Sequence, residues 1–188
     1  MVKLIESVSY THLDVYKRQD VQNEECLIEA LVKFNSSNFR YLHLSCHADS
    51  TGIEIGGIEI TNERLSNIIG NALTKKRLFM SACQGSNIDI ASKIISKNKA
   101  YSLIGTPQDL RFDKSVLFWP TFYHVINEID SSKMGFVAIK NSLIKCVNLL
   151  NITIDFYSFI RKDKNKMRVT KLRKDSTTKT NIISLDHK

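Results

Sequence analysis

The segment of residues 77–86, RLFMSACQGS, places a cysteine just after a short apolar run. Residues 78–80 are typical of a buried β-strand, and Cys83 follows where a glutamine and a glycine break the pattern. In an open α/β sheet, loops and ligands gather at the carboxyl ends of the strands. The sequence therefore predicts a thiol at such an edge, where it can meet a substrate.

A second apolar run ends at a histidine. Residues 41–46, YLHLSC, lead to His47, after which the chain becomes polar. His47 and Cys83 are 36 residues apart, which is enough for a helical crossover between parallel strands. Neighbouring parallel strands end at the same edge of their sheet, so we expect the imidazole and the thiol to meet there.

Three ordered blocks resemble the caspase-like cysteine peptidases and, within them, the CHAT-domain branch. The block LHLSCHADSTGIEI is similar to its histidine block, and LFMSACQGSNIDIASKI is similar to its cysteine block. A third block, YSLIGTPQDLRFDKSVLFWPTFYHVI, resembles the segment in which a strand and a turn lead into a helix. The resemblance covers roughly residues 21–148.

The resemblance implies an α/β fold: a caspase-like three-layer sandwich with a mainly parallel central sheet, flanking helices and a β-hairpin after the histidine strand. It also implies a cysteine endopeptidase in which Cys83 forms a thioester and His47 transfers the proton. The backbone N–H groups of Ala48 and Cys83 would stabilise the oxyanion. Family members act in bacterial signalling and defence, which implies a protein or peptide substrate and control by a regulatory protein or repeat domain.

Two departures from the family pattern keep other interpretations open. Ala48 stands where the family has glycine, and residues 107–112 lack the family's tryptophan and paired acidic residues. A catalytically inactive caspase-like interaction module is therefore one alternative. An unrelated flavodoxin-like binding domain is another, and in such a domain His47 and Cys83 need not converge.

Two acidic residues and one histidine are further candidates near the expected site. Asp49 and Asp109 fall in the flanking loops, where they are candidates for a pocket that accepts a basic residue before the scissile bond. Acidic loop residues are more often simply solvated. For His43, which shares a strand face with His47, we expect a buried structural role.

Composition fits one globular cytoplasmic domain. Of the 188 residues, 43% are hydrophobic, and no apolar run approaches the roughly 20 residues that span a bilayer. The amino-terminal stretch lacks the apolar core of a signal peptide. The four cysteines show no C-x-x-C spacing, so we expect no disulfides and no metal site. We also expect no cofactor and, because no apolar run is long enough, no membrane partner.

The predicted domain lies between two atypical segments. Residues 9–19, SYTHLDVYKRQ, look like a translated cloning adapter, so we interpret residues 1–20 as a non-native or disordered leader. If so, one or two early strands of the native sheet are missing or are replaced by residues 2–5. Residues 21–173 would form the caspase-like domain, and residues 174–188 a basic flexible tail.

Positive charge is concentrated in the C-terminal region. Residues 161–188 carry ten Lys or Arg and three Asp, which is +7 of the formal net charge of +8. Such a segment can attract nucleic acid or an acidic partner. No aromatic residues interleave with the basic ones, so a solvated basic segment is favoured and nucleic acid stays open as an alternative.

Local patterns predict the remaining elements. They indicate helices at residues 21–34, 61–72, 87–97, 113–129 and 133–149, a strand at 100–105, and hairpins about Gly56-Gly57 and between 152–160 and 167–172. Trp119-Pro120 predicts a kink or boundary in its helix.

Overall fold

A mixed β-sheet forms the centre of the computed structural model, which describes residues 2–7, 16–130, 133–174 and 178–185. Its eight strands are, in spatial order, β11 (Lys179–Ser184), β10 (Lys166–Leu172), β9 (Ile154–Phe159), β8 (Ser102–Gly105), β7 (Arg77–Ser81), β3 (Tyr41–Ser45), β1 (Val2–Ser7) and β2 (Tyr16–Val21). Three short strands, β4 (His47–Ala48), β5 (Gly52–Ile55) and β6 (Ile58–Thr61), form a second sheet.

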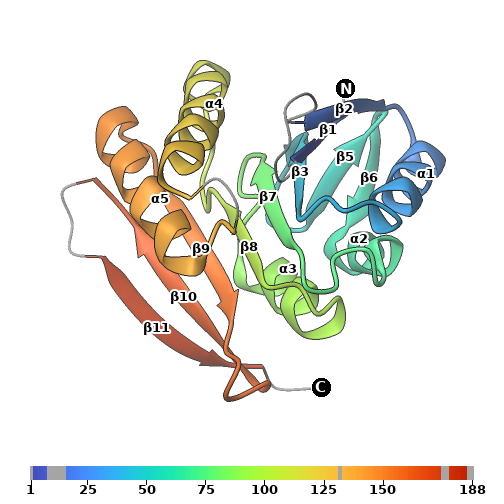
Figure 1. Cartoon of the computed structure of the whole chain (residues 1–188). Coiled ribbons are helices and arrows are strands. Elements are labelled where there is room, and N and C mark those ends of the chain that lie inside the picture. Colours follow the sequence, from blue (N-terminus) through green and yellow to red (C-terminus); the bar gives the residue numbers. More distant parts are fainter. Residues whose placement is uncertain (1, 8–15, 131–132, 175–177, 186–188) are drawn as a thin grey trace.

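Helices cover both faces of the large sheet (Figure 1). One face carries α1 (Glu24–Asn35), α2 (Asn62–Ile69) and α3 (Ile88–Ser92), which continues as the π-helix η1 (Lys93–Lys97); the other carries α4 (Phe112–Ile129) and α5 (Phe136–Leu150). Alternate strand residues point to opposite faces of the sheet. Leu42 and Leu44 therefore pack on the face covered by α1, α2 and α3, whereas Tyr41 and Phe79 pack against α4 and α5. The predicted α/β class, with helices on both sides of a central sheet, is thus confirmed.

The expectation of a mainly parallel sheet is wrong. Among the described strands, only β3 with β7 and β7 with β8 pair in parallel; the other described pairs in the large sheet are antiparallel. A single crossover helix would return the chain to the end of the sheet where β8 begins, so that the next strand would run parallel to β8. Two helices, α4 and α5, follow β8 instead. The chain therefore returns to the sheet at the carboxyl end of β8, where Asp155 lies opposite Gly105, and β9 runs antiparallel to β8.

Both terminal segments contain strands. β1 pairs with β2 and with β3, where we expected a non-native or disordered leader, and residues 8–15 of that segment lie outside the described residues. β11 pairs with β10, where we expected a flexible tail. Charge alone suggested a tail, yet Ile183 packs against the core and Leu185 is 6% exposed, so apolar contacts hold this strand in place.

The smaller sheet is anchored by its hairpin. Gly56 and Gly57 have φ values of +61° and +83°, as the predicted turn requires. A Cβ at Gly56 would also lie 2.2 Å from the carbonyl oxygen of Gln22, so only glycine allows this close approach. Thr61 then caps α2 by accepting a hydrogen bond from the Arg64 N–H at 3.2 Å.

The remaining helices follow the predicted order with shifted ends. Pro120 lies inside a continuous α4 rather than at a boundary. None of the helices among the described residues combines the length and apolarity needed to cross a membrane.

Candidate active site

The register between β3 and β7 relates the two predicted catalytic residues. Tyr41 pairs with Arg77 and Ser45 with Ser81, always 36 residues apart, and the next residue, Cys46, still donates its N–H to the Ser81 carbonyl at 3.3 Å. The same 36 residues separate His47 from Cys83. The two residues therefore leave adjacent parallel strands at the same edge of the sheet.

Cys83 lies on the side of the sheet that faces α4. Its thiol is half-buried and contacts the main chain of Leu110, with Sγ 3.4 Å from the Leu110 nitrogen and 3.7 Å from its oxygen. Two residues earlier, the Ser81 hydroxyl lies 2.6 Å from the hydroxyl of Ser115 in α4. These contacts hold the segment around Leu110, which leads into α4, beside the thiol of Cys83.

The residue after Cys83 has an unusual backbone. Gln84 has a φ of +50°, in the left-handed region that residues other than glycine seldom occupy. Its N–H donates to the Gln108 carbonyl at 3.1 Å, and its side-chain amide donates to Asp109 at 3.1 Å. Strained backbone of this kind is concentrated at functional sites, where surrounding contacts maintain it.

Asn87 connects the cysteine loop to the histidine loop. Its side-chain Nδ2 lies 3.1 Å from the Ser50 carbonyl and 3.4 Å from the Gln84 carbonyl. Its Oδ1 accepts hydrogen bonds from the Asp89 and Ile90 N–H groups at the start of α3. One side chain therefore holds both loops against the same helix end.

His47 begins a new strand instead of ending the first. It is exposed, and β4 leaves the large sheet to pair with β5, with His47 opposite Glu54 and Ala48 opposite Ile53. The next pair is hydrogen-bonded, because the Asp49 N–H donates to the Gly52 carbonyl at 3.1 Å. Antiparallel pairs alternate, so the Ala48 N–H points away from β5.

Ala48 is accommodated without the strain that a left-handed backbone would impose. It lies in extended β4, and its φ is not positive. Its small side chain packs against the core beneath the small sheet. Alanine in place of glycine therefore does not by itself distort this position.

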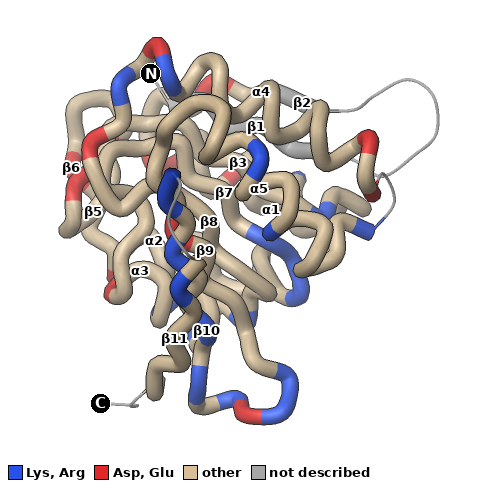
Figure 2. Tube along the Cα trace, turned by 90° about the vertical axis from the view of Figure 1, so that its left-hand side faces the viewer, with Lys and Arg blue, Asp and Glu red and all other residues tan. Residues whose placement is uncertain are grey.

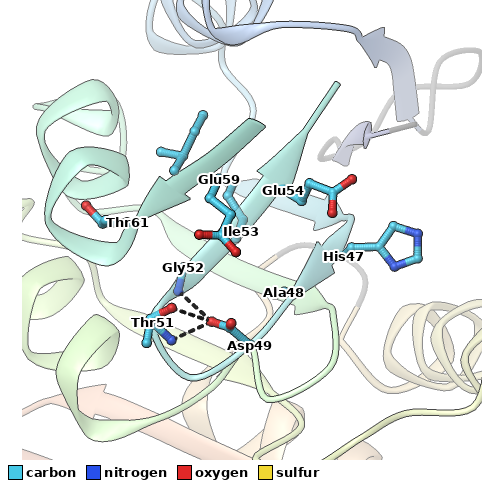
Figure 3. Close-up of a pocket in the computed structure, with 10 residues that line it drawn as sticks. His47, Ala48, Asp49, Thr51, Gly52, Ile53, Glu54, Glu59 and Thr61 are labelled. Carbon is cyan, nitrogen blue, oxygen red and sulfur yellow. Dashed lines mark hydrogen bonds between the residues drawn. The ribbon is translucent and has the colours of Figure 1, made fainter. Parts of the chain in front are cut away.

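A pocket of about 150 Å³ lies on the small sheet and is lined by His47, Ala48, Asp49, Thr51, Gly52, Ile53, Glu54, Glu59, Ile60 and Thr61. Cys83 does not line it. Figure 3 shows the imidazole of His47 at its outer margin, beside Glu54. Because Glu54 is opposite both His47 and Glu59, these three residues form a row across the three strands.

The two predicted pocket carboxylates have local partners. Asp49 accepts hydrogen bonds from the Thr51 hydroxyl, the Thr51 N–H and the Gly52 N–H at 2.7, 2.7 and 3.1 Å (Figure 3). These hydrogen bonds lower the pKa of Asp49, with that from the Thr51 hydroxyl contributing most. Asp109 binds Gln84 and so belongs to the cysteine loop. Asp49 and Asp109 thus lie on different loops of the site.

The other histidine of the strand and two further cysteines are structural. His43 is 2% exposed, its Nδ1 lies 2.8 Å from the Tyr123 hydroxyl, and burial lowers its pKa to about 3. Burial raises the pKa of Cys46 to about 12 and that of Cys146 to about 11. These groups stay neutral near pH 7.

Three contributors to the candidate site could not be identified from the sequence. They are Asn87, Glu54 and the main chain of Leu110. The helix-capping position of Asn87 was visible in the sequence, but its bridge to Ser50 depends on tertiary contacts.

Comparison with known proteins identifies no relative: no family model and no curated protein matches the chain. Within the part of the chain that the structure describes, no group of three His, Cys, Asp or Glu side chains could hold a metal ion.

Proposed function

We propose that this protein is a caspase-like, CHAT-type cysteine endopeptidase with Cys83 as nucleophile and His47 as general acid and base. The shared register of β3 and β7 carries the proposal, because it brings both residues to one sheet edge. The left-handed Gln84 and the Asn87 bridge between the two loops support it further.

The proposed reaction proceeds through a thioester. The sulfur of Cys83 attacks the carbonyl carbon of a peptide bond, the C–N bond breaks, and His47 delivers the thiol proton to the departing amine. Water then attacks the thioester, and His47 passes a proton from that water to the leaving sulfur. The N–H groups of Ala48 and Cys83 are the proposed oxyanion donors.

The acidic pocket favours a substrate with a basic residue. Glu54 and Glu59 are directly opposite each other, an arrangement that is unfavourable unless a cation lies between or beside them. Asp49 adds a third carboxylate to the lining. Asp109 would contact the substrate from the cysteine loop.

Glu54 also has a proposed role toward His47. A carboxylate beside an imidazole selects one tautomer and orients the ring, and Glu54 is the residue across from His47. Replacing Glu54 with Gln should therefore slow hydrolysis more than the matched replacement Glu59→Gln.

An inactive interaction module is the second candidate. It is favoured by the contacts between the Cys83 thiol and Leu110, and by the position of the pocket away from the thiol. In an active peptidase, a regulatory protein, a repeat domain or the substrate would have to displace the Leu110 segment. A cytoplasmic location and a role in bacterial signalling or defence belong to the same proposal.

Hydrolysis in H₂¹⁸O tests the proposal without a known substrate. A peptide library prepared by cutting the proteins of a bacterial lysate after Asp and Glu, which leaves Lys and Arg inside the peptides, is incubated with the wild type, Cys83→Ala or the control Cys26→Ala, and mass spectrometry detects ¹⁸O at new C-termini. We expect new C-termini, enriched after Lys or Arg, with wild type and Cys26→Ala only. Equal product sets from wild type and Cys83→Ala would refute the peptidase.

A further inference from the structure

β11 forms one edge of the large sheet. It pairs with β10 on one side, and no described strand pairs with its other side. Ile183 is half-buried, and the other five residues of the strand are exposed. Figure 2 turns this side of the molecule toward the viewer and shows Lys and Arg positions along β10, along β11 and in the loop before β10.

The hydrogen-bond pattern shows which backbone groups face outward. The Leu185 N–H donates to the Asn165 carbonyl at 2.6 Å, which extends the β10–β11 register by one hydrogen-bonded pair. Such pairs alternate along antiparallel strands, so Asn181 and Ile183 direct their backbone groups toward β10. Thr180 and Ile182 direct theirs to the open edge.

A lysine and an isoleucine are exposed on opposite faces of β11. Lys171 in β10 is directly opposite Lys179 in β11, and both are exposed. Like charges in this arrangement repel. Asp155, on the other side of Lys171, already forms an ion pair with Arg173 at 2.8 Å. On the opposite face of β11, Ile182 is 62% exposed and lies across from Arg168, whose guanidinium is 5.0 Å from the centre of the Phe136 ring.

We propose that β11 binds an extended acidic segment of a partner protein as an additional strand. The outward groups of Thr180 and Ile182 would hydrogen-bond to its backbone. Acidic side chains on one face would lie beside Lys179 and relieve its repulsion from Lys171. Apolar side chains on the other face would cover Ile182, so the matching sequence alternates acidic and apolar residues.

Charge and composition favour this occupant over two others. A second copy of the chain would carry the same formal net charge of +8, so it would add positive charge near Lys179 and not relieve the repulsion. A single-stranded nucleic acid would gain from stacking on aromatic rings, but residues 160–188 contain no Phe, Tyr or Trp. A protein backbone is also the natural match for the free groups of a strand edge.

Binding of a fluorescent peptide with alternating Glu and Val residues tests the proposal by anisotropy. We expect saturable binding, a loss of at least about tenfold in affinity for Ile182→Pro, and unchanged affinity for the control Ile182→Val. Proline removes the outward N–H, and Ile182 makes no ladder bond to β10 that would be lost. Lys171→Gln with Lys179→Gln should also weaken binding, whereas Lys162→Gln with Lys164→Gln, in the loop, should weaken it less.

Hydrogen exchange of the wild type gives an independent measurement that does not require Ile182→Pro to fold. The peptide should slow exchange of the Ile182 amide, while the Asn181 amide, already bonded to β10, should change little. Equal binding of a Lys and Val peptide, unchanged exchange at Ile182, or tighter binding of oligo-dT than of the acidic peptide would overturn the proposal. All of these measurements are independent of peptidase activity.

Discussion

His43 and His47 come from one stretch of sequence, but their surroundings give them different chemistry. His43 lies among Phe79, Trp119 and Tyr123, and burial lowers its pKa from 6.5 to about 3. His47 is exposed at the start of β4, where it can exchange protons with solvent or substrate. Burial therefore assigns the structural role to His43 and leaves the proposed catalytic role to His47.

The lowered pKa of His43 predicts a pH-dependent stability. Between pH 6.5 and about 3 the unfolded chain binds a proton at His43 that the folded protein does not, so stability falls as the pH falls through this range. From pH 7 to pH 5, wild type should lose about 2 kcal/mol more unfolding free energy than His43→Gln. Urea titrations at both pH values measure this difference.

The exposed His124 provides the control for this prediction. His124→Gln should keep the pH dependence of the wild type. If His43→Gln has the same pH dependence as the wild type, the folded protein must bind a proton at His43, and its assignment as a neutral core residue is wrong.

At the scale of elements, the start of α3 holds the candidate site together. Asn87 caps this helix through Oδ1 and joins Ser50 to Gln84 through Nδ2. The cap and the bridge use different atoms of one amide group. Substitution can therefore separate helix stability from the arrangement of the two loops.

Asn87→Ala removes both functions, whereas Asn87→Asp keeps an oxygen for the cap and removes the bridging donor. We expect Asn87→Ala to lower the unfolding free energy by about 1–2 kcal/mol. Asn87→Asp should change stability little but reduce hydrolysis nearly as much as Asn87→Ala. Thermal unfolding and the ¹⁸O assay together measure the two effects. Full activity in Asn87→Asp would show that the bridge does not position the site.

At the scale of the whole molecule, sequence patterns predicted the elements better than their assembly. The apolar runs before His47 and Cys83 indicated the parallel strands β3 and β7, and Gly56-Gly57 indicated the small hairpin. The β9–β10 hairpin and the two helices before it were also indicated, but the antiparallel pairing of β8 with β9 was not, because local patterns do not specify at which end of β8 the chain returns to the sheet.

The site was predictable to a similar extent. Two apolar segments that lead to His47 and Cys83 suggested that both residues lie at the same end of neighbouring parallel strands. The parallel register of β3 and β7 agrees with that expectation. The bridge of Asn87, the Glu54 partner position and the Leu110 contact join residues distant in sequence. Single-sequence patterns carry no signal for such contacts.

A dyad of Cys83 and His47 can be detected from the rate at which iodoacetamide alkylates each cysteine. Mass spectrometry gives these rates for Cys83 and the half-buried Cys26 in wild type and in His47→Ala. At pH 7 we expect Cys83 to react at least about tenfold faster than Cys26, and we expect His47→Ala to remove most of this difference. A Cys83 that reacts no faster than Cys26, or at a rate unaffected by His47→Ala, would contradict the proposed dyad.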